Sequence, residues 1–162
     1  MTDALTDALV GALLEAIPGS SVDEGFPPAT IDVPVESWAD TVAAARALGL
    51  TFFDFLSAVD EPDGVRVVCH LVRPEPFGHV VLRTALDAGC AVASVATVYD
   101  GAAWHERETA EMFGVTFLDG DGKPIPMAPL LLPPGFTDHP LRKGYALQAR
   151  VETPWPGEKE PT

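Results

Sequence analysis

The sequence is poor in basic residues, and this scarcity excludes several classes of protein. Lys and Arg number 10 against 24 Asp and Glu, which gives a formal net charge of −14 at pH 7. Proteins that bind nucleic acid contact its phosphates mainly through Lys and Arg, and basic segments attract anionic membrane surfaces. The composition therefore argues against a nucleic-acid-binding protein and against direct docking on a membrane. It leaves open a basic protein partner.

Cysteines and long apolar runs are also scarce. Cys69 and Cys90 form no CxxC pair, and with four scattered histidines they do not make a zinc or iron–sulfur site by themselves. No stretch approaches the roughly 20 apolar residues of a membrane span. The first 17 residues include three acidic residues and no Lys or Arg, which does not fit a secretory signal. We expect no membrane span and no cofactor or metal held by this chain.

The order of apolar and polar residues predicts a mixture of helices and strands. A chain of 162 residues favours one domain. Because no regular strand–helix–strand alternation is visible, the pattern predicts an α+β fold of two layers, with helices packed on a mixed, largely antiparallel sheet. Helices are expected at about 3–17, 36–48 and 102–113, strands at 50–59, 65–72 and 79–82, a hairpin turn at 61–64, and strand or extended chain at 91–99.

The composition changes after residue 118. Six prolines lie between residues 119 and 140, which is typical of a long irregular segment that must lie against something to be ordered. We therefore divide the chain into an α+β domain at 1–118, an extended partner-binding segment at 119–150 and a flexible tail at 151–162.

The helix expected at 102–113, which Gly114 would end, has no clean polar face. On a helical wheel, Glu106 and Glu108 fall among its aromatic and apolar residues. One interpretation is a surface helix supported by i,i+4 pairs such as Arg107 with Glu111. The other is a helix covered on both sides, whose glutamates would meet cations because an unpaired buried carboxylate costs several kcal/mol.

A basic cluster at 138–145 follows the proline-rich run. Arg142 and Lys143 are either solvated loop charges or the cations that meet Glu106 and Glu108. They could equally meet a partner surface.

A hydrolytic metal site is a further alternative. The HExxH pattern of zinc proteases begins at His105 but lacks its second histidine, because Thr109 stands there. Imidazole and carboxylate groups are plausible metal ligands, so a stand-alone metal-dependent hydrolase would use a mixed set. That set is His105, Glu108, Glu111 and His139.

Two motifs in this region resemble those of a known family. Residues 104–114, WHERETAEMFG, are similar to the signature W-x-E-R-E-x-x-D/E-φ-F-G, and residues 138–145, DHPLRKGY, are similar to G/D-H-P-L-R-K-D-Y. In this order they resemble the 30 kDa (C-type) subunit family of respiratory complex I, the proton-pumping NADH-quinone oxidoreductase. The related subunit of membrane-bound [NiFe] hydrogenases shares the first motif and is the alternative. Ala128-Pro129 departs from the family, where an arginine pair is usual.

The resemblance implies a non-catalytic structural subunit in the peripheral arm of the complex. Such a subunit braces the quinone-binding module and binds no cofactor, while NADH, FMN, iron–sulfur clusters and quinone belong to the whole complex. The implied partners are a large quinone-pocket subunit of the D type and a small iron–sulfur subunit of the B type. The implied location is the cytoplasmic face of the cell membrane, as a peripheral part of a membrane complex.

The resemblance also assigns the residues of the two motifs to a partner interface. We expect Glu106, Glu108, Arg142 and Lys143 to form charge pairs within the motif region or across the contact with a partner, and residues 124–140 to lie along that partner. The interface residues are Trp104, Glu106, Arg107, Glu108, Phe113, Gly114, His139, Pro140, Leu141, Arg142, Lys143 and Tyr145.

Overall fold

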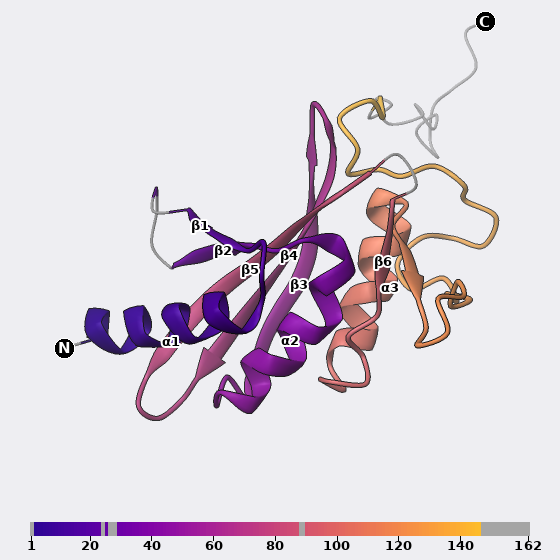
Figure 1. Cartoon of the computed structure of the whole chain (residues 1–162). Helices are drawn as coiled ribbons and strands as arrows, with labels where there is room; N and C mark the ends of the chain where they lie inside the picture. Colours follow the sequence, from indigo (N-terminus) through magenta and orange to yellow (C-terminus); the bar gives the residue numbers. More distant parts are fainter. Residues whose placement is uncertain (1, 24, 26–28, 88–89, 147–162) are drawn as a thin grey trace, which may run out of the picture.

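Three α-helices and a five-stranded sheet form the main body of the chain in a computed structural model, which describes residues 2–23, 25, 29–87 and 90–146 (Figure 1). The helices are α1 (Thr2–Ala16), α2 (Trp38–Ala47) and α3 (Ala102–Phe113), with a short 3₁₀ helix η1 (Val35–Ser37) before α2. The strands are β1 (Ser21–Asp23), β2 (Thr30–Asp32), β3 (Phe52–Glu61), β4 (Gly64–Arg73), β5 (Gly78–Leu86), β6 (Ala91–Ala93) and β7 (Thr116–Leu118).

The sheet has the strand order β1-β2-β5-β4-β3. Strand β2 runs parallel to β5, and the other neighbours are antiparallel. The expected turn at 61–64 is confirmed, because β3 and β4 pair up to Glu61 opposite Gly64. Strands β6 and β7 form a separate parallel pair beside α3. The α+β fold class is therefore confirmed.

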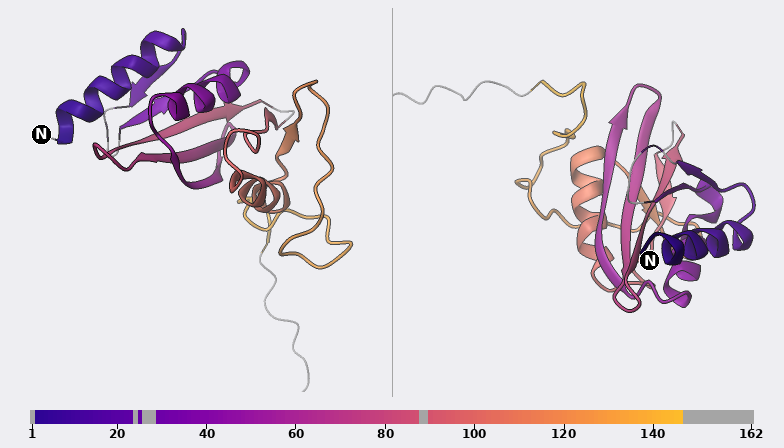
Figure 2. Two further views of the ribbon diagram at one scale, coloured as in Figure 1. Left: turned by 90° about the horizontal axis from the view of Figure 1, so that it is seen from below. Right: turned by 90° about the vertical axis from the view of Figure 1, so that its left-hand side faces the viewer.

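The described helices cover one face of the large sheet. Alternate residues of β4, from Val65 to Leu71, are at most 1% exposed, as the period of a strand with one buried face requires. Helices α1 and α2 lie over this inner face (Figure 2). Helix α3 packs beside the edge strand β3. The core therefore lies between the helices and the inner face, and no described helix covers the outer face.

The details differ from the expectation in three places. The run at 91–99 is a strand only at Ala91–Ala93 and then turns. The two parallel pairings were not predicted, because short strands of three residues carry too little pattern to show a partner.

Within the described residues, no helix is long and apolar enough to cross a membrane. The expected tail at 151–162 lies outside the described residues, and the division into segments stays a prediction.

Candidate functional site

The two sequence motifs meet at the C-terminal end of α3. An α-helix leaves its last carbonyl groups without partners inside the helix. Here the segment that carries the second motif supplies the donors. Leu141 N–H donates to the Met112 carbonyl (3.1 Å), the Arg142 Nε–H donates to the Phe113 carbonyl (2.6 Å) and His139 Nδ1 lies 2.8 Å from the Glu111 carbonyl oxygen. The second motif is therefore the cap of the first.

Gly114 makes this close approach possible. It ends α3 with φ of +72°, a left-handed conformation that favours glycine. A Cβ atom on residue 114 would lie 2.5 Å from His139 Nε2. The Glu111 carbonyl can only accept, so His139 carries its proton on Nδ1 and is fixed in orientation. Gly114 and His139 thus hold the two motifs in contact.

Glu106 is buried inside this chain and does not meet a cation. Its side chain is 1% exposed and accepts hydrogen bonds from the Ser94 hydroxyl (2.7 Å) and the Val95 N–H (2.7 Å). Burial raises the pKa of the Glu106 carboxyl, and these hydrogen bonds work against that rise. The expected charge pair of Glu106 is therefore wrong, and its role is to fix the turn that follows β6. Phe113, 6% exposed, also belongs to the core. Neither residue is available to a partner in this conformation.

Arg142 pairs with an aspartate that the sequence analysis missed. Its guanidinium lies 3.1 Å from Asp60, at the far end of β3, and the Lys143 backbone N–H donates to the same carboxylate (2.7 Å). The Lys143 N–H, and then Arg142, hold the pKa of Asp60 below its usual value. The expected pairing of Arg142 with Glu106 or Glu108 is corrected accordingly. No local signal points to Asp60, which lies 82 residues away in the sequence.

Arg107 and Glu111 grip the proline-rich segment by its backbone. Arg107 donates to the carbonyls of Ala128 (3.1 Å) and Pro129 (2.8 Å), and Glu111 accepts from the N–H groups of Leu130 (2.7 Å) and Leu131 (2.8 Å). Partial burial works to raise the pKa of Glu111, but these backbone donors hold it below its usual value. One turn of α3 therefore binds both carbonyl and N–H groups of the neighbouring segment.

Several large apolar side chains of α3 and of the segment that it binds are exposed. Trp104 is 61% exposed, Leu131 57%, Leu141 54% and Phe136 40%. The Arg107 guanidinium lies 5.2 Å from the centre of the Trp104 ring. Large exposed apolar groups on a helix and on the segment that it binds are candidates for an interaction site. We call these four side chains the α3 patch; Glu108, on the same helix, is exposed, and no described residue pairs with it.

The other expected interface residues lie around this patch. Pro140 and Tyr145 are partly buried and Lys143 is exposed. The Tyr145 ring lies 6.4 Å from the Phe136 ring. A small hollow of about 180 Å³ opens between the end of α3 and the proline-rich loop, and its walls are mainly Met127, Leu132 and the prolines.

The metal site considered above is not formed. His105 turns toward β3, where its Nδ1 lies 3.2 Å from the Leu56 carbonyl oxygen, whereas His139 lies at the other end of α3. Glu111 is engaged by backbone N–H groups. Among the residues that the structure describes, no three His, Cys, Asp or Glu side chains gather as metal ligands. The geometry of the site is that of a packed polypeptide surface.

Comparison with protein families gives a match over most of the chain. Residues 31–151 match the family model of the respiratory-chain NADH dehydrogenase 30 kDa subunit. The C-type subunit of the NADH-quinone oxidoreductase of Rhodopseudomonas palustris (strain TIE-1) is 33% identical over 93% of this chain and 74% of the relative. The C/D-type subunit of R. palustris (strain HaA2) is 42% identical over 51% of this chain, which corresponds to 14% of that longer relative.

Solved structures share the fold at low sequence identity. A chain of the membrane-bound sulfane sulfur reductase, an archaeal respiratory membrane complex, superposes with a TM-score of 0.75 at 20% identity, covering 96% of this chain and 98% of the other. The trypsin-resistant fragment of Nqo5 superposes with a TM-score of 0.58 at 21% identity, covering 70% and 94%. Both support the α+β architecture described above.

Proposed function

Because this chain belongs to the 30 kDa subunit family of the respiratory-chain NADH dehydrogenase, we propose that it is a structural subunit of the peripheral arm of an NADH-quinone oxidoreductase. In this role it braces the quinone-binding module from the cytoplasmic side of the membrane. The chain itself binds no cofactor, and NADH, FMN, iron–sulfur clusters and quinone belong to its partners.

The observation that carries this proposal is the way α3 presents the following segment. Arg107, Glu111 and the helix end bind backbone groups of residues 128–131 and of Leu141, and the side chains of the α3 patch stay outside the chain's own core. A catalytic site would instead direct reactive groups into a cavity. An ordered segment whose apolar groups face outward fits a surface that another polypeptide covers.

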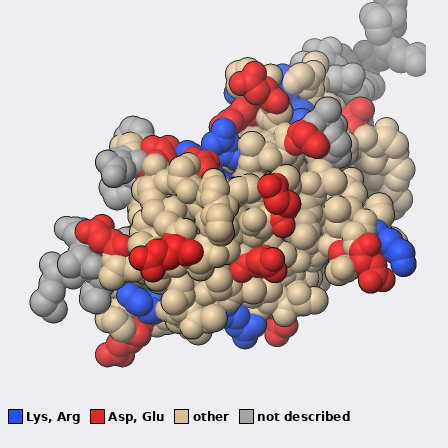
Figure 3. Space-filling model, viewed as in Figure 1, with Lys and Arg blue, Asp and Glu red and all other residues tan. Residues whose placement is uncertain are grey.

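The partner that best fits the patch is a large subunit of the D type. A relative whose name joins the C and D types supports this choice. A small iron–sulfur subunit of the B type is the second proposed neighbour. Asp and Glu dominate the charged side chains on the face drawn in Figure 3, and the net charge of −14 favours partners with basic surfaces.

Assembly of the complex tests the proposal directly. Leu131→Asp and Leu141→Asp place a charge where an apolar contact is proposed, and Leu48→Asp, at a 37% exposed position on the end of α2, is the matched control. Loss of one buried leucine contact corresponds to about 1.5–3 kcal/mol, and 1.4 kcal/mol is about tenfold in a binding constant. We expect at least tenfold less assembled complex on blue-native gels for the first two variants and no change for the control.

Turnover separates bracing from catalysis. NADH-quinone activity per assembled copy should equal that of the parent in every variant, because the chain supplies no reacting group. Normal assembly combined with slow turnover per copy would contradict the structural role.

A further inference from the structure

The outer face of the five-stranded sheet is divided into a polar half and an apolar half. Strand register places Val59 beside Arg66, and Phe55 beside His70 and then Val81, with all of these side chains directed away from the helices. One row further along, Phe52 lies beside Val72 and His79. An antiparallel sheet with one face in water normally has polar side chains on that face. The half of this face around His70 does not follow that rule.

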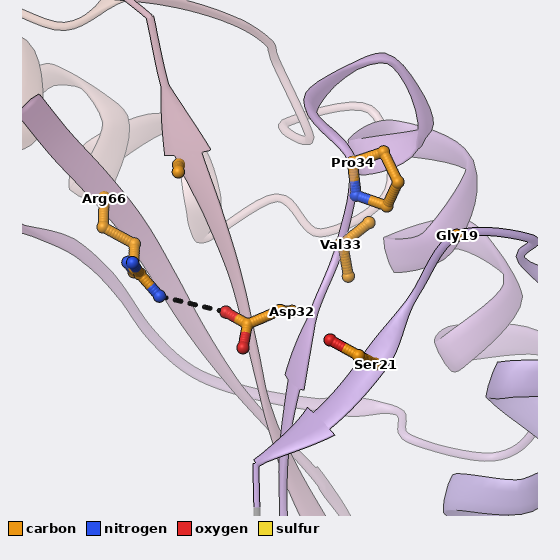
Figure 4. A pocket seen from close by; sticks show the side chains of 7 residues that line it. Gly19, Ser21, Asp32, Val33, Pro34 and Arg66 are labelled. Atoms are coloured by element: carbon orange, nitrogen blue, oxygen red, sulfur yellow. Dashed lines mark hydrogen bonds and ion pairs between the residues drawn. The ribbon is translucent and has the colours of Figure 1, made fainter.

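The polar half is satisfied within the chain. Arg83 pairs with Asp32 (2.6 Å) and Asp23 (2.8 Å), while Arg66 pairs with Asp32 (3.1 Å) and Glu61 (3.0 Å). Arg66 and Asp32, which Figure 4 shows directed at each other, both line an open hollow of about 420 Å³ at this end of the sheet. Each of these charged groups already has a partner within the chain, so the polar half needs no charged group from another protein.

The apolar half carries a continuous row of rings. Phe55, His70, His79 and Phe77 follow one another with ring centres 5.8, 5.2 and 5.4 Å apart. We call these four residues the ring row. Phe77 is 52% exposed and Phe55 37%, and Phe52 nearby is 55% exposed. Three large exposed aromatic side chains on one half of a sheet face are an interaction surface rather than scattered surface residues.

Hydrogen bonds within the ring row leave only acceptors free. His70 Nδ1 lies 2.8 Å from Asp54 Oδ2, and His70 Nε2 lies 3.0 Å from His79 Nδ1. The carboxylate can only accept, so His70 donates from Nδ1 and accepts at Nε2 from the Nδ1–H of His79. Nε2 of His79 is then an acceptor, and no described residue donates to it. Asp54 is 47% exposed at its side chain, and no described Lys or Arg pairs with it.

The free acceptors and the exposed rings together define the chemistry of a ligand. A planar guanidinium stacks on aromatic faces and donates to carboxylates, and an ammonium on its alkyl stem makes similar contacts. We propose that the ring row with Asp54 is a second docking surface, which takes an arginine- or lysine-bearing apolar surface of a neighbouring protein in the complex. This surface lies outside the α3 patch and serves a separate contact.

A second copy of this chain is a poorer occupant. Each copy carries a net charge of −14, and a two-fold contact would bring two Asp54 carboxylates to the same face. A cationic partner instead gains from the same charges. The proposal rests on the proposed function only in that the assembled complex supplies the neighbour.

Burial on assembly is the first test. Phe77→Cys in the full chain is labelled with a maleimide in the free protein and in the isolated complex. The parent chain, with Cys69 buried and Cys90 partly buried, gives the background. We expect labelling to slow at least tenfold in the complex. Equal rates in the two states would overturn the proposal, whereas a Leu131→Cys chain that stays reactive would overturn the α3 patch alone.

Matched substitutions form the second test. Phe55 and Leu48 are both 37% exposed, so Phe55→Asp and Leu48→Asp introduce the same charge at equal exposure. We expect at least tenfold less complex for Phe55→Asp and less than a twofold change for Leu48→Asp, with unchanged melting of both free chains. Equal assembly would overturn the proposal. A dimer of the free chain that Phe55→Asp abolishes would identify a second copy as the occupant and overturn the choice of partner.

Charge reversal tests the cation. Asp54→Asn keeps a hydrogen-bond acceptor for His70 but removes the charge, and Asp54→Lys reverses it. Assembly at low salt should fall at least tenfold further for Asp54→Lys than for Asp54→Asn, and the gap should narrow at high salt because exposed charges are screened. Equal assembly of the two variants would show that the partner presents no cation here.

Discussion

The α+β domain and the segment at 119–146 are ordered by different forces. In the domain, alternating apolar side chains of β4 and β5 pack under α1 and α2 and are nearly inaccessible to water. In the segment, most side chains are partly or fully exposed. The segment is fixed mainly through its backbone, by side chains of α3 and by the carbonyls at the end of that helix.

This difference underlies the different roles that we propose for the two parts. Apolar burial stabilises a fold in proportion to the area removed from water, and the domain has used its apolar side chains in this way. The segment has used polar contacts instead, so Leu131 and Leu141 remain outside. Under the proposed function, the domain would act as the support, and the segment would present its apolar groups to a partner.

The largest expected effect comes from replacing Glu106 in the domain. Glu106→Ala leaves the Ser94 hydroxyl and the Val95 N–H without an acceptor in the core. Each unpaired buried donor costs about 1–3 kcal/mol, so for two donors we expect a loss of about 2–6 kcal/mol in the free energy of unfolding, measured by urea titration. Glu106→Gln retains one acceptor oxygen and should lose less. Equal stability of parent and Glu106→Ala would show that the domain does not depend on this polar contact.

The next effect strikes the junction between the two parts. Gly114→Ala forces an ordinary residue into a left-handed conformation, at about 1–2 kcal/mol, and drives its Cβ into His139. Gly122→Ala is the matched control, because φ is +74° there and no atom lies within 4 Å. We expect Gly114→Ala to lower the melting temperature and to expose Arg142 to trypsin, whereas Gly122→Ala, inside the segment, leaves Arg142 protected. Equal cleavage in both would place the junction elsewhere.

A smaller effect is expected in the segment alone. Glu111→Gln removes the carboxylate that accepts from Leu130 and Leu131, while Glu108→Gln, on the same helix, removes a carboxylate with no described partner. Loss of a contact of about 1 kcal/mol raises the open population roughly fivefold. Chymotrypsin should therefore cut Glu111→Gln about fivefold faster after Leu130 or Leu131, without a change in melting temperature. A drop in melting temperature would mean that domain and segment unfold together.

The smallest effect concerns the outer face of the domain and depends on pH. Partial burial, and then the neighbouring His70, lower the pKa of His79 below its usual 6.5. The unfolded chain therefore binds a proton more readily, so the contribution of His79 to stability is complete above pH 6.5 and is lost as the pH falls toward the lower folded pKa. His79 contacts His70 and Phe77, and Asp54 binds the other ring nitrogen of His70.

Melting curves at pH 7.5 and 5.5 measure this effect. The melting temperature of His79→Gln should fall less between pH 7.5 and pH 5.5 than that of the parent. A larger loss in the variant would show that protonation of His79 stabilises the fold.

Much of the domain could be predicted because it follows local periodicity. The helices around Leu9 and Val42, the hairpin at 61–64 and the end of α3 at Gly114 all carry short-range patterns that the structure confirms. The proline content of 119–140 also predicted an irregular segment. These features depend on residues within one or two turns of each other.

The partners of the charged side chains could not be predicted in the same way. Arg142 binds Asp60 and Glu106 binds Ser94 because the fold brings separate segments together. By sequence alone, other carboxylates were equally plausible partners for Arg142. The capping of α3 by His139, Leu141 and Arg142 did have a signal. Gly114 ends the helix, so its last carbonyls had to find donors, and the basic motif was the nearest unassigned source.

The prolines of the segment have a consequence for the time before assembly. A proline has no N–H to offer a neighbouring strand, and with six prolines between residues 119 and 140 the segment makes only an isolated bridge, between Pro124 and Leu118, within the described residues. Strand β3, at the edge of the large sheet, is meanwhile shielded by α3. A free copy therefore exposes the apolar side chains of the α3 patch, while neither the segment nor β3 offers the continuous backbone ladder on which aggregates grow.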